Sequence, residues 1–243
     1  MASVLVTGST QGLGRLSAQW LLDCGHMVIL HARSTDRMDA VDTLLAQGCT
    51  AVVGDFGDQS AIHQVADQVN ALGPLDAVIH NAGVVDGPDL VTINVVAPYI
   101  LTALINRPSR LIYLSSNDHF GGVGDIDRLG LDGGVPTATY ADTKWFLTAF
   151  AMAMSIRWPD TVCSAVDPGW VPTRMGGVYA PDDLSQGAVT QAWLAVGQES
   201  TAYMSGHYWY HMRPRQPHHG TQDHGCHEAL IRSLASFTGV SLP

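Results

Sequence analysis

A glycine-rich segment directly after a short apolar run is the feature that most constrains the fold of this chain. Residues 4–6 are apolar, and residues 7–14 follow with the spacing T-G-x-x-x-G-x-G before a helical pattern of apolar residues begins. Glycine lets the backbone turn sharply and approach a ligand closely, and the N–H groups at the start of a helix favour an anion. The segment therefore predicts the first βα unit of a nucleotide-binding sheet, with a turn that holds phosphate.

The spacing of these glycines differs from that of two common phosphate-binding motifs. It is neither the G-x-G-x-x-G of many dinucleotide-binding proteins nor a P-loop, because no Gly-Lys-Ser/Thr follows. By itself the segment also fits a strand-to-helix loop that binds no ligand. The residues further along the chain must distinguish the two interpretations.

Short apolar runs alternate with helical patterns along the whole chain. The expected strands lie at residues 4–6, 26–31, 50–53, 76–80, 110–114, 161–166 and 207–210, and the expected helices at 13–21, 38–46, 59–72, 94–106, 140–157 and 184–196. Strands rich in β-branched residues between helices predict a parallel sheet covered on both faces. We therefore expect an α/β fold, a Rossmann-type doubly wound sheet of about seven strands, in a single domain over residues 1–243.

Two segments interrupt this alternation. Residues 117–134 are rich in glycine and aspartate and are expected to form a surface loop. Residues 175–183 contain two glycines and a proline, and we expect them to form a mobile lid.

The charge and the cysteines limit the classes of partner. The chain has 12 Lys and Arg against 22 Asp and Glu, a net charge of -10, and its basic residues are scattered, so nucleic acid is not an expected partner. The 4 cysteines lie far apart and form no C-x-x-C pair, which argues against a disulfide framework or a thiolate metal site. Because no signal-peptide pattern or bilayer-spanning stretch stands out, we expect a cytoplasmic protein with no membrane partner.

Glycine-containing and polar segments follow the expected strands. In a parallel sheet the carboxyl ends of the strands meet near one edge, and ligands bind there. We therefore expect one cleft to contain residues 7–14, Arg33, Asp55, Phe56, residues 81–83, Ser116, Pro168 and Gly169.

Tyr140 and Lys144 stand four residues apart in a predicted helix and therefore share one of its faces. A phenol with a pKa of about 10 is a poor acid or base near neutral pH, and a neighbouring ammonium group favours the phenolate. Such a pair suits general acid and base catalysis. Taken alone, the pair also fits an ordinary helix surface.

The motifs together resemble the classical short-chain dehydrogenase/reductase family. They occur in the family's order: the glycine turn at 7–14, Asn81-Ala82-Gly83, Asn94, Ser116, Tyr140 with Lys144, and Pro168-Gly169 with Thr173. The resemblance covers nearly the whole chain. His80 departs from the pattern, since an asparagine often precedes Asn-Ala-Gly in the family.

The resemblance implies a reaction and a role for each catalytic residue. Hydride passes between C4 of a nicotinamide and a carbonyl or carbinol carbon, while Tyr140 gives or takes the proton on the oxygen. Lys144 lowers the pKa of the tyrosine and binds the nicotinamide ribose. Ser116 hydrogen-bonds the substrate oxygen, and Asn94 holds a water that links the lysine to a proton relay.

The residues at the end of the second expected strand favour NADP(H) over NAD(H). NAD-dependent members usually carry an acidic residue near position 32, which is an alanine here, and Arg33 beside it suits a 2′-phosphate. Asp36 leaves NAD(H) open, and Asp55 resembles the acid that contacts the adenine amino group. The full set of expected cofactor contacts is Gly8, Ser9, Thr10, Gln11, Gly12, Leu13, Gly14, Arg33, Asp55, Phe56, Asn81, Ala82, Gly83, Tyr140, Lys144, Pro168, Gly169, Val171 and Thr173.

Residues 116–127 and the end of the chain from residue 205 resemble the retinol-dehydrogenase-like branch more weakly, which does not imply retinol as the substrate. The expected substrate is a small carbonyl or alcohol compound. Trp170, Met175 and Tyr179 are expected to wall its pocket. His119 either lines that pocket or caps the loop in which it lies.

Three further expectations concern metals, rival functions and assembly. The histidine-rich residues 218–227 match no standard metal-site spacing, and we expect no metal. Rival functions are the reduction of an imine or activated alkene, or dinucleotide binding by a catalytically silent regulatory protein. The resemblance implies a homodimer or homotetramer paired through the helices of Asn94 and Tyr140.

Overall fold

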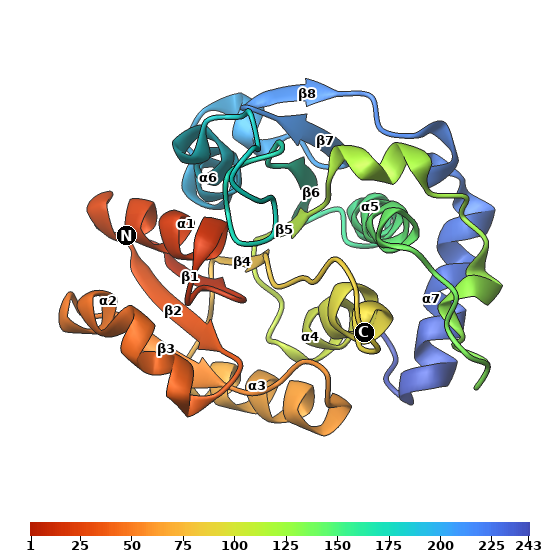
Figure 1. The fold of residues 1–243 in the computed structure, drawn as a ribbon, viewed down its shortest axis with the longest axis horizontal. Helices are drawn as coiled ribbons and strands as arrows, with labels where there is room; N and C mark the ends of the chain where they lie inside the picture. Colours follow the sequence, from red (N-terminus) through yellow and green to blue (C-terminus); the bar gives the residue numbers. More distant parts are fainter.

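An eight-stranded sheet runs through the centre of the computed structural model, which describes all residues 1–243 (Figure 1). Its strand order is β3-β2-β1-β4-β5-β6-β7-β8, and every pair is parallel except β7 with β8. The strands are β1 (Ser3–Val6), β2 (Met27–Ala32), β3 (Thr50–Val53), β4 (Ala77–His80), β5 (Arg110–Leu114), β6 (Val162–Asp167), β7 (His207–Tyr210) and β8 (Arg213–Arg215). The predicted Rossmann-type doubly wound fold is confirmed, with one more strand than expected.

Helices cover both faces of the sheet. They are α1 (Gly12–Asp23), α2 (Asp42–Ala46), α3 (Gln59–Ala71), α4 (Ala97–Leu104), α5 (Tyr140–Arg157), α6 (Leu184–Val196) and α7 (His224–Thr238). In β1, Leu5 packs into the apolar cluster formed with α3, α4 and α5, whereas Val4 and Val6 pack into the cluster formed with α1, α2 and α6. Successive strand residues point to opposite faces, so an almost wholly apolar strand is what a sheet buried on both sides requires.

Several connections differ from the expected pattern. The helix expected at 38–46 is a 3-10 segment, η1 (Thr35–Val41), followed by the short α2, and the helix expected from Asn94 begins with a π-helical turn, η2 (Thr92–Val96), before α4. The segment 117–134 contains two 3-10 helices, η3 (Asn117–Gly121) and η4 (Ile126–Leu129), and buries His119 and Leu129. It is therefore more than a surface loop, because two of its side chains pack into the interior.

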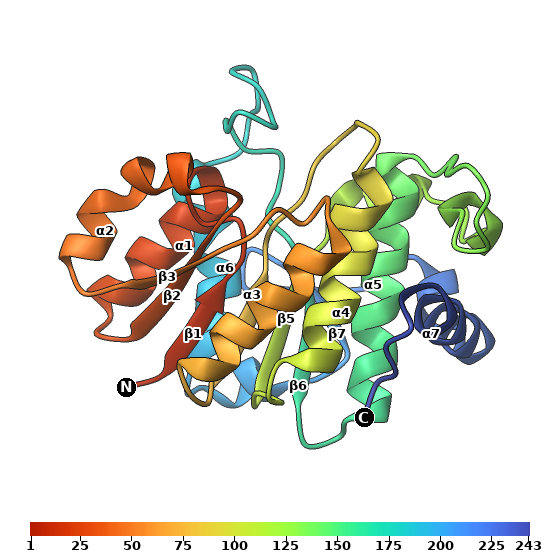
Figure 2. The same ribbon diagram turned by 90° about the horizontal axis from the view of Figure 1, so that it is seen from below.

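The loop after β6 projects from the sheet at the top of Figure 2. Residues 170–183 contain no helix or strand, and the loop leads directly into α6. This loop contains the segment in which a lid was expected. No helix combines the length and the apolar character needed to cross a bilayer.

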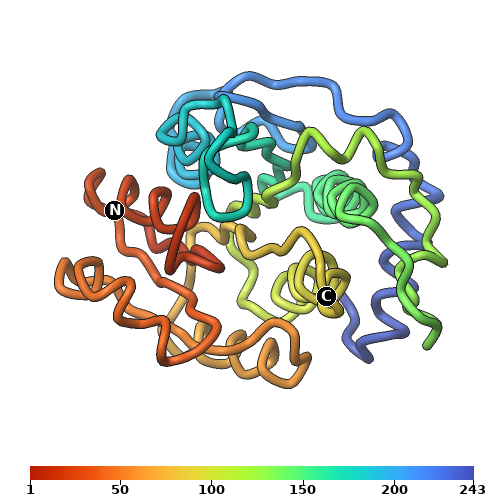
Figure 3. Tube along the Cα trace, viewed as in Figure 1, coloured from red at the N-terminus to blue at the C-terminus, as the bar shows by residue number.

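The end of the chain covers α4 and α5. Every residue of α5 from Asp142 to Met154 is buried, and Leu230 and Leu234 of α7 are buried against this layer. The trace in Figure 3 returns to α4 at its end, where the Tyr99 hydroxyl donates to the carbonyl of Val240 at 2.7 Å. The surface expected to join two subunits is therefore occupied by the chain's own carboxyl-terminal segment.

Candidate active site

A cleft of about 1000 Å³ opens at the carboxyl edge of the parallel strands. It extends from the turn after β1, past the ends of β2, β3, β4 and β5, to the loop after β6. The predicted site residues that line it are Gly8, Thr10, Gln11, Gly12, Leu13, Gly14, Arg33, Asp55, Phe56, Asn81, Ala82, Gly83, Tyr140, Lys144, Pro168, Thr173 and Met175. Segments far apart in the sequence thus meet in one place.

The other predicted site residues lie outside this lining, including Ser116, whose neighbour Ser115 lines the cleft instead. Ser9 is buried, and its hydroxyl accepts the backbone N–H of His31 at 2.9 Å. Val171 is buried, and Gly169 donates its N–H to the Asp167 carboxylate at 2.9 Å. These three residues therefore support the walls of the cleft.

The turn after β1 is held by residues that follow β4. The side-chain amide of Asn81 donates to the carbonyls of Thr7 at 2.8 Å and Gly8 at 3.1 Å, and the Thr7 hydroxyl accepts the N–H groups of Asn81 and Ala82. Gly8 has a φ of 63°, and a Cβ there would lie 2.9 Å from the Cα of Ala82. Only glycine fits this position without displacing the neighbouring backbone.

The start of α1 is open to a ligand. Gln11 occupies the N-cap position, and its side chain makes no hydrogen bond to the helix, so the first N–H groups of α1 lack a side-chain cap. Residues 11–14 line the cleft at this point. Uncapped N–H groups and the positive end of a helix dipole suit a pyrophosphate, so this part of the cleft fits a dinucleotide.

Three arginines line the same end of the cleft in a protein of net charge -10. Arg33 lies 3.8 Å from the carboxylate of Asp55, and both side chains are well exposed. Arg15 donates to the hydroxyl of Thr43 at 3.2 Å, and Arg37 completes the group. Arg15 and Arg37 were not predicted from the sequence, although Arg15 directly follows the last glycine of the turn.

The predicted catalytic pair, Tyr140 and Lys144, lies at the start of α5. The ammonium nitrogen of Lys144 is 5.5 Å from the centre of the Tyr140 ring and donates to the carbonyl of Leu114 at 2.6 Å. Lys144 is the only lysine of the chain, and burial lowers its pKa to about 8. Burial also raises the pKa of Tyr140 to about 12, against the opposing effect of a hydrogen bond with the Ser116 side chain.

The direction of the Tyr140 pKa differs from the expectation that Lys144 lowers it. Removing the phenol from water disfavours its charged form, and this effect outweighs the others in the structure. The carboxylates of Asp118 and Asp167 add to it. Tyr140 is therefore protonated at neutral pH in this state, as a proton donor must be.

The two adjacent serines after β5 have different surroundings. The Ser115 hydroxyl is buried, 2.6 Å from the Thr148 hydroxyl, and also donates to the carbonyl of Lys144. The Ser116 hydroxyl accepts the N–H of Asp118 at 3.1 Å and is hydrogen-bonded with Tyr140. Ser115 is the one that lines the cleft, whereas Ser116 has the contact with Tyr140.

Asn94 lies on the π-helical turn and is fully buried. Its side chain accepts the N–H of Val84 at 2.9 Å and donates to the carbonyl of Val84 at 2.8 Å and to the hydroxyl of Thr143 at 3.0 Å. Thr143 in turn donates to the carbonyl of Tyr140. Asn94 therefore joins the loop after β4 to the first turn of α5.

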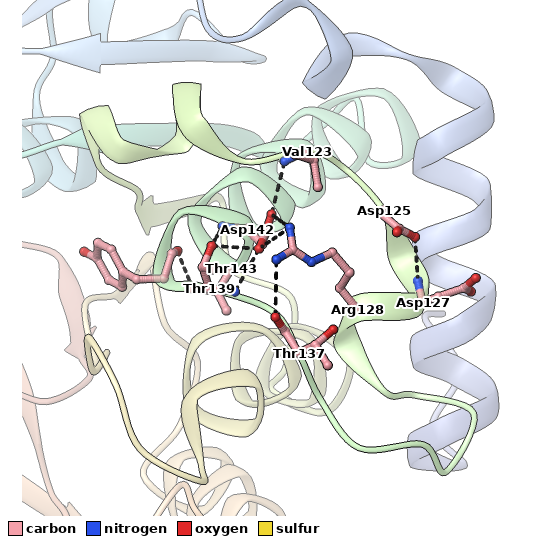
Figure 4. A network of polar contacts seen from close by, with 9 residues as sticks. Val123, Asp125, Asp127, Arg128, Thr137, Thr139, Asp142 and Thr143 are labelled. Atoms are coloured by element: carbon pink, nitrogen blue, oxygen red, sulfur yellow. Dashed lines mark hydrogen bonds and ion pairs between the residues drawn. The ribbon is translucent and has the colours of Figure 1, made fainter.

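An ion pair with a buried carboxylate fixes the start of α5 (Figure 4). Asp142 accepts from the backbone N–H and hydroxyl of Thr139, which caps the helix, and from the N–H of Val123. Arg128 of η4 donates to Asp142 at 3.1 Å and pairs with its second oxygen at 3.0 Å. The segment between β5 and α5 is thereby fastened to the helix that carries Tyr140.

Comparison with known proteins agrees with these motifs and this geometry. The family model described as short chain dehydrogenase matches residues 2–108. The short-chain dehydrogenase chry4 of Gibberella zeae is 36% identical over 100% of this chain and 99% of that protein. This chain belongs to the short-chain dehydrogenase/reductase family.

Weaker similarity extends to other proteins. The human dehydrogenase/reductase SDR family member 13 is 28% identical over 80% of this chain and 58% of that protein. Among solved structures, an uncharacterised protein of Mycobacterium paratuberculosis superimposes with a TM-score of 0.81 at 20% identity, covering 100% of this chain and 95% of that one. The RhlG/NADP active-site complex of Pseudomonas aeruginosa gives a TM-score of 0.70 at 20% identity, with 86% of this chain and 94% of that one covered.

Only one of the three residues expected to wall the substrate pocket lines the cleft. Met175 lines the cleft, whereas Trp170 and Tyr179 belong to the projecting loop and are 59% and 90% exposed. The indole N–H of Trp170 donates to the carbonyl of Gly176 at 2.8 Å, so this ring closes the loop on itself. The loop therefore contributes Met175 to the cleft lining but leaves Trp170 and Tyr179 outside it.

His119 lies outside the cleft lining. Its ring is fully buried, with Nδ1 2.8 Å from the Ser116 carbonyl and Nε2 accepting the N–H of His218 at 3.0 Å. Of the two roles considered for His119, these contacts fit the capping of the loop. The ring connects the Ser116 segment to the carboxyl-terminal part of the chain.

The histidine-rich segment makes hydrogen bonds within the protein. The indole of Trp145 on α5 donates to Nδ1 of His218 at 3.0 Å, and the His227 ring lies 2.8 Å from the carbonyl of Thr221. No group of three or more metal-binding side chains is present in the structure. His218 therefore attaches the segment before α7 to α5, and His227 attaches that segment to α7.

Proposed function

We propose that this protein is an NADP(H)-dependent oxidoreductase that acts on a small carbonyl or alcohol compound, with Tyr140 as general acid and base. The observation that carries the proposal is the presence of Tyr140 and Lys144 in the same cleft as the glycine turn and the uncapped start of α1. The expected contacts with the dinucleotide, including those of Ser9, Gly169, Val171 and Thr173, are part of this proposal. When bound, the dinucleotide supplies or accepts the hydride.

The preference for NADP(H) is supported by charge. Arg15, Arg33 and Arg37 line one end of the cleft, where they suit a phosphate dianion better than a neutral ribose. Asp36, the acidic residue that left NAD(H) open, is exposed and lies outside the lining. The Pseudomonas aeruginosa structure of similar fold is an NADP complex, which is consistent with this assignment.

The proton chemistry follows from the surroundings of Tyr140. In the reductive direction its phenol donates a proton to the substrate oxygen, and Ser116 hydrogen-bonds the same oxygen. The phenolate that remains is stabilised by the ammonium group of Lys144, which lies 5.5 Å from the ring. Asn94 would hold the first turn of α5 and the water of the proton relay.

A substrate screen tests the proposed function. Purified protein with NADPH or NADH would be offered aldehydes, ketones, imines and activated alkenes, and oxidation of the reduced nicotinamide would be followed by absorbance. We expect NADPH oxidation with at least one aldehyde or ketone. If calorimetry shows binding of neither NADPH nor NADH, the proposal is contradicted. If only imines or alkenes are turned over, the substrate is an imine or alkene rather than a carbonyl compound.

We propose that any homodimer or homotetramer of this protein uses a surface other than α4 and α5. The carboxyl-terminal segment packs on these helices, with Leu230, Leu234 and the Val240 carbonyl in contact with the layer that they form. Pairing through this face would require removing that segment and exposing apolar surface. Light scattering, combined with cysteine crosslinking from exposed positions on α5 and α7, would test this, and crosslinks between the α5 helices of two subunits would contradict it.

We also propose a cytoplasmic location. All four cysteines are unpaired, which is the form expected in a reducing compartment. Cell fractionation would test this, and recovery in a membrane or secreted fraction would contradict it.

A further inference from the structure

His31 is a buried histidine at the cofactor end of the cleft, and no motif in the sequence pointed to it. It lies in β2, is 3% exposed and contributes to the lining of the cleft. Both of its ring nitrogens have protein partners. Nδ1 accepts the backbone N–H of Gly8 at 3.0 Å, and Nε2 lies 2.9 Å from the carbonyl of Gly54.

These contacts define one chemical form of the ring. A nitrogen that accepts from an N–H carries no proton, and a nitrogen facing a carbonyl must donate one. The ring is therefore the neutral Nε2–H tautomer. Burial lowers its pKa to about 4, which keeps it in that form at neutral pH.

The contacts also join three parts of the cofactor end. Gly8 belongs to the glycine turn, Gly54 follows β3, and the His31 ring stacks on Phe56 with ring centres 4.0 Å apart. The main chain of His31 adds two bonds to the turn, because its N–H donates to the Ser9 hydroxyl and its carbonyl accepts the Ser9 N–H at 3.1 Å. One residue thus connects the turn to the wall where the adenine is expected.

We infer that His31 is a positioning residue for the dinucleotide: its neutral ring holds Gly8 and fixes the turn that receives the pyrophosphate. This inference rests on the proposed function, since it concerns binding of the same cofactor. Gly8 has a φ of 63°. An unrestrained glycine would adopt this backbone conformation only part of the time, because many others are open to it. A turn that is fixed before binding loses less entropy when the ligand arrives.

Two substitutions separate the hydrogen bond from the packing of the ring. His31→Phe keeps a flat ring against Phe56 but removes the acceptor for Gly8. His31→Asn removes the ring but retains an oxygen near the position of Nδ1. If the bond to Gly8 is what matters, the asparagine variant will bind the cofactor better than the phenylalanine variant.

His80 supplies a matched control. It is also buried at the end of a strand, 2% exposed, and it stacks on Tyr113 with ring centres 4.7 Å apart. Its contact with the Thr102 hydroxyl lies away from the glycine turn. His80→Phe therefore makes the same chemical change in a neighbouring strand without touching Gly8.

The experiment measures NADPH binding by calorimetry for the wild type, His31→Phe, His31→Asn and His80→Phe, with thermal melts to establish folding. We expect His31→Phe to bind roughly tenfold more weakly, His31→Asn to recover much of that loss and His80→Phe to match the wild type. With any substrate found, kcat at saturating NADPH should stay within about twofold, since Tyr140 is untouched. Equal binding by wild type and a folded His31→Phe protein, or equal losses in all variants, would overturn the inference. A wild type that binds neither dinucleotide would instead overturn the proposed function.

Discussion

The cofactor end and the substrate end of the cleft are built in different ways. At the cofactor end, Gly8, His31 and Asn81 are joined by hydrogen bonds between strands that neighbour one another in the sheet. At the substrate end, Trp170 and Tyr179 lie on a projecting loop without helix or strand, and most of their surface is exposed. The first end is organised before a ligand arrives, and the second has few contacts that would hold it in place.

Cofactor binding and substrate selection therefore depend on different parts of the molecule. A rigid site binds one cofactor with little loss of entropy, whereas an exposed loop can change its sequence without disturbing the sheet. The substrate preference of this protein should therefore depend on the loop, and its cofactor preference on the strand ends. Substitutions at the two ends should act on different kinetic constants.

Tyr140→Phe lies where the two ends meet and should have the largest effect. Loss of the proton donor should lower kcat by about 10²–10⁴-fold, because general acid catalysis contributes that much, while NADPH affinity changes by less than about threefold. Steady-state kinetics and calorimetry on the same preparation measure both quantities. Wild-type turnover by the variant would contradict the assigned role of Tyr140.

Arg33→Ala tests the cofactor end alone. Loss of a charge-assisted contact with the 2′-phosphate should weaken NADPH binding by about tenfold or more and leave NADH binding nearly unchanged. Arg232→Ala, at an exposed position on α7, is the control for the loss of one positive charge. Equal losses for NADPH and NADH would refute the assignment of Arg33.

Tyr179→Ala and Trp170→Ala test the substrate end. Each should change the KM of the substrate by no more than about twofold, because both side chains are largely exposed and lie outside the cleft lining, and NADPH affinity should not change. Trp170→Phe retains an aromatic ring but removes the hydrogen bond to Gly176, and it would show whether the loop needs that bond. A change in NADPH affinity of similar size would mean that the two ends are not independent.

Two buried histidines, His31 and His80, should make the stability of the protein sensitive to acid. Burial lowers the pKa of His31 to about 4 and that of His80 to about 3, from 6.5 in the unfolded chain. Between these values the unfolded chain binds more protons, so the free energy of unfolding decreases as the pH falls from 6.5 towards 4.

Thermal melts at about pH 7.5 and about pH 5 should therefore show a loss of roughly 5 °C or more at the lower pH. Because phenylalanine cannot take up a proton, His80→Phe should have a smaller loss than the wild type. An equal loss in the variant would mean that other groups cause the acid sensitivity.

The sequence predicted the parts of the molecule that local patterns determine. The β-branched runs predicted seven strands, and the motifs after them predicted which segments meet in the cleft. β8 was missed because it has only three residues, one of them Pro214, and is recognisable only by its pairing with β7. The parallel register of β2 with β1 and β3 brings His31 to Gly8 and Gly54, and no local pattern shows such long-range contacts.

Burial was the second property that the sequence did not reveal. The pair Tyr140 and Lys144 was recognised from its spacing, but the direction of the tyrosine pKa depends on how much water the surrounding elements exclude. His119 was assigned two alternative roles for the same reason, because its distance from the cleft depends on how η3 packs against the end of the chain. The sequence therefore indicated which residue types act together better than it indicated how deeply each residue is buried.

Because α7 covers α5, it also determines when α5 can complete its folding during synthesis. Ribosomes release the amino-terminal part of a chain first, so the β1–α1 turn and the strands around it can assemble while synthesis continues. Helix α5 cannot complete its packing until α7 has been synthesised, because Leu230 and Leu234 are part of the apolar cluster that encloses it. During that interval the nascent chain exposes an apolar face of α5, which is a surface that chaperones bind.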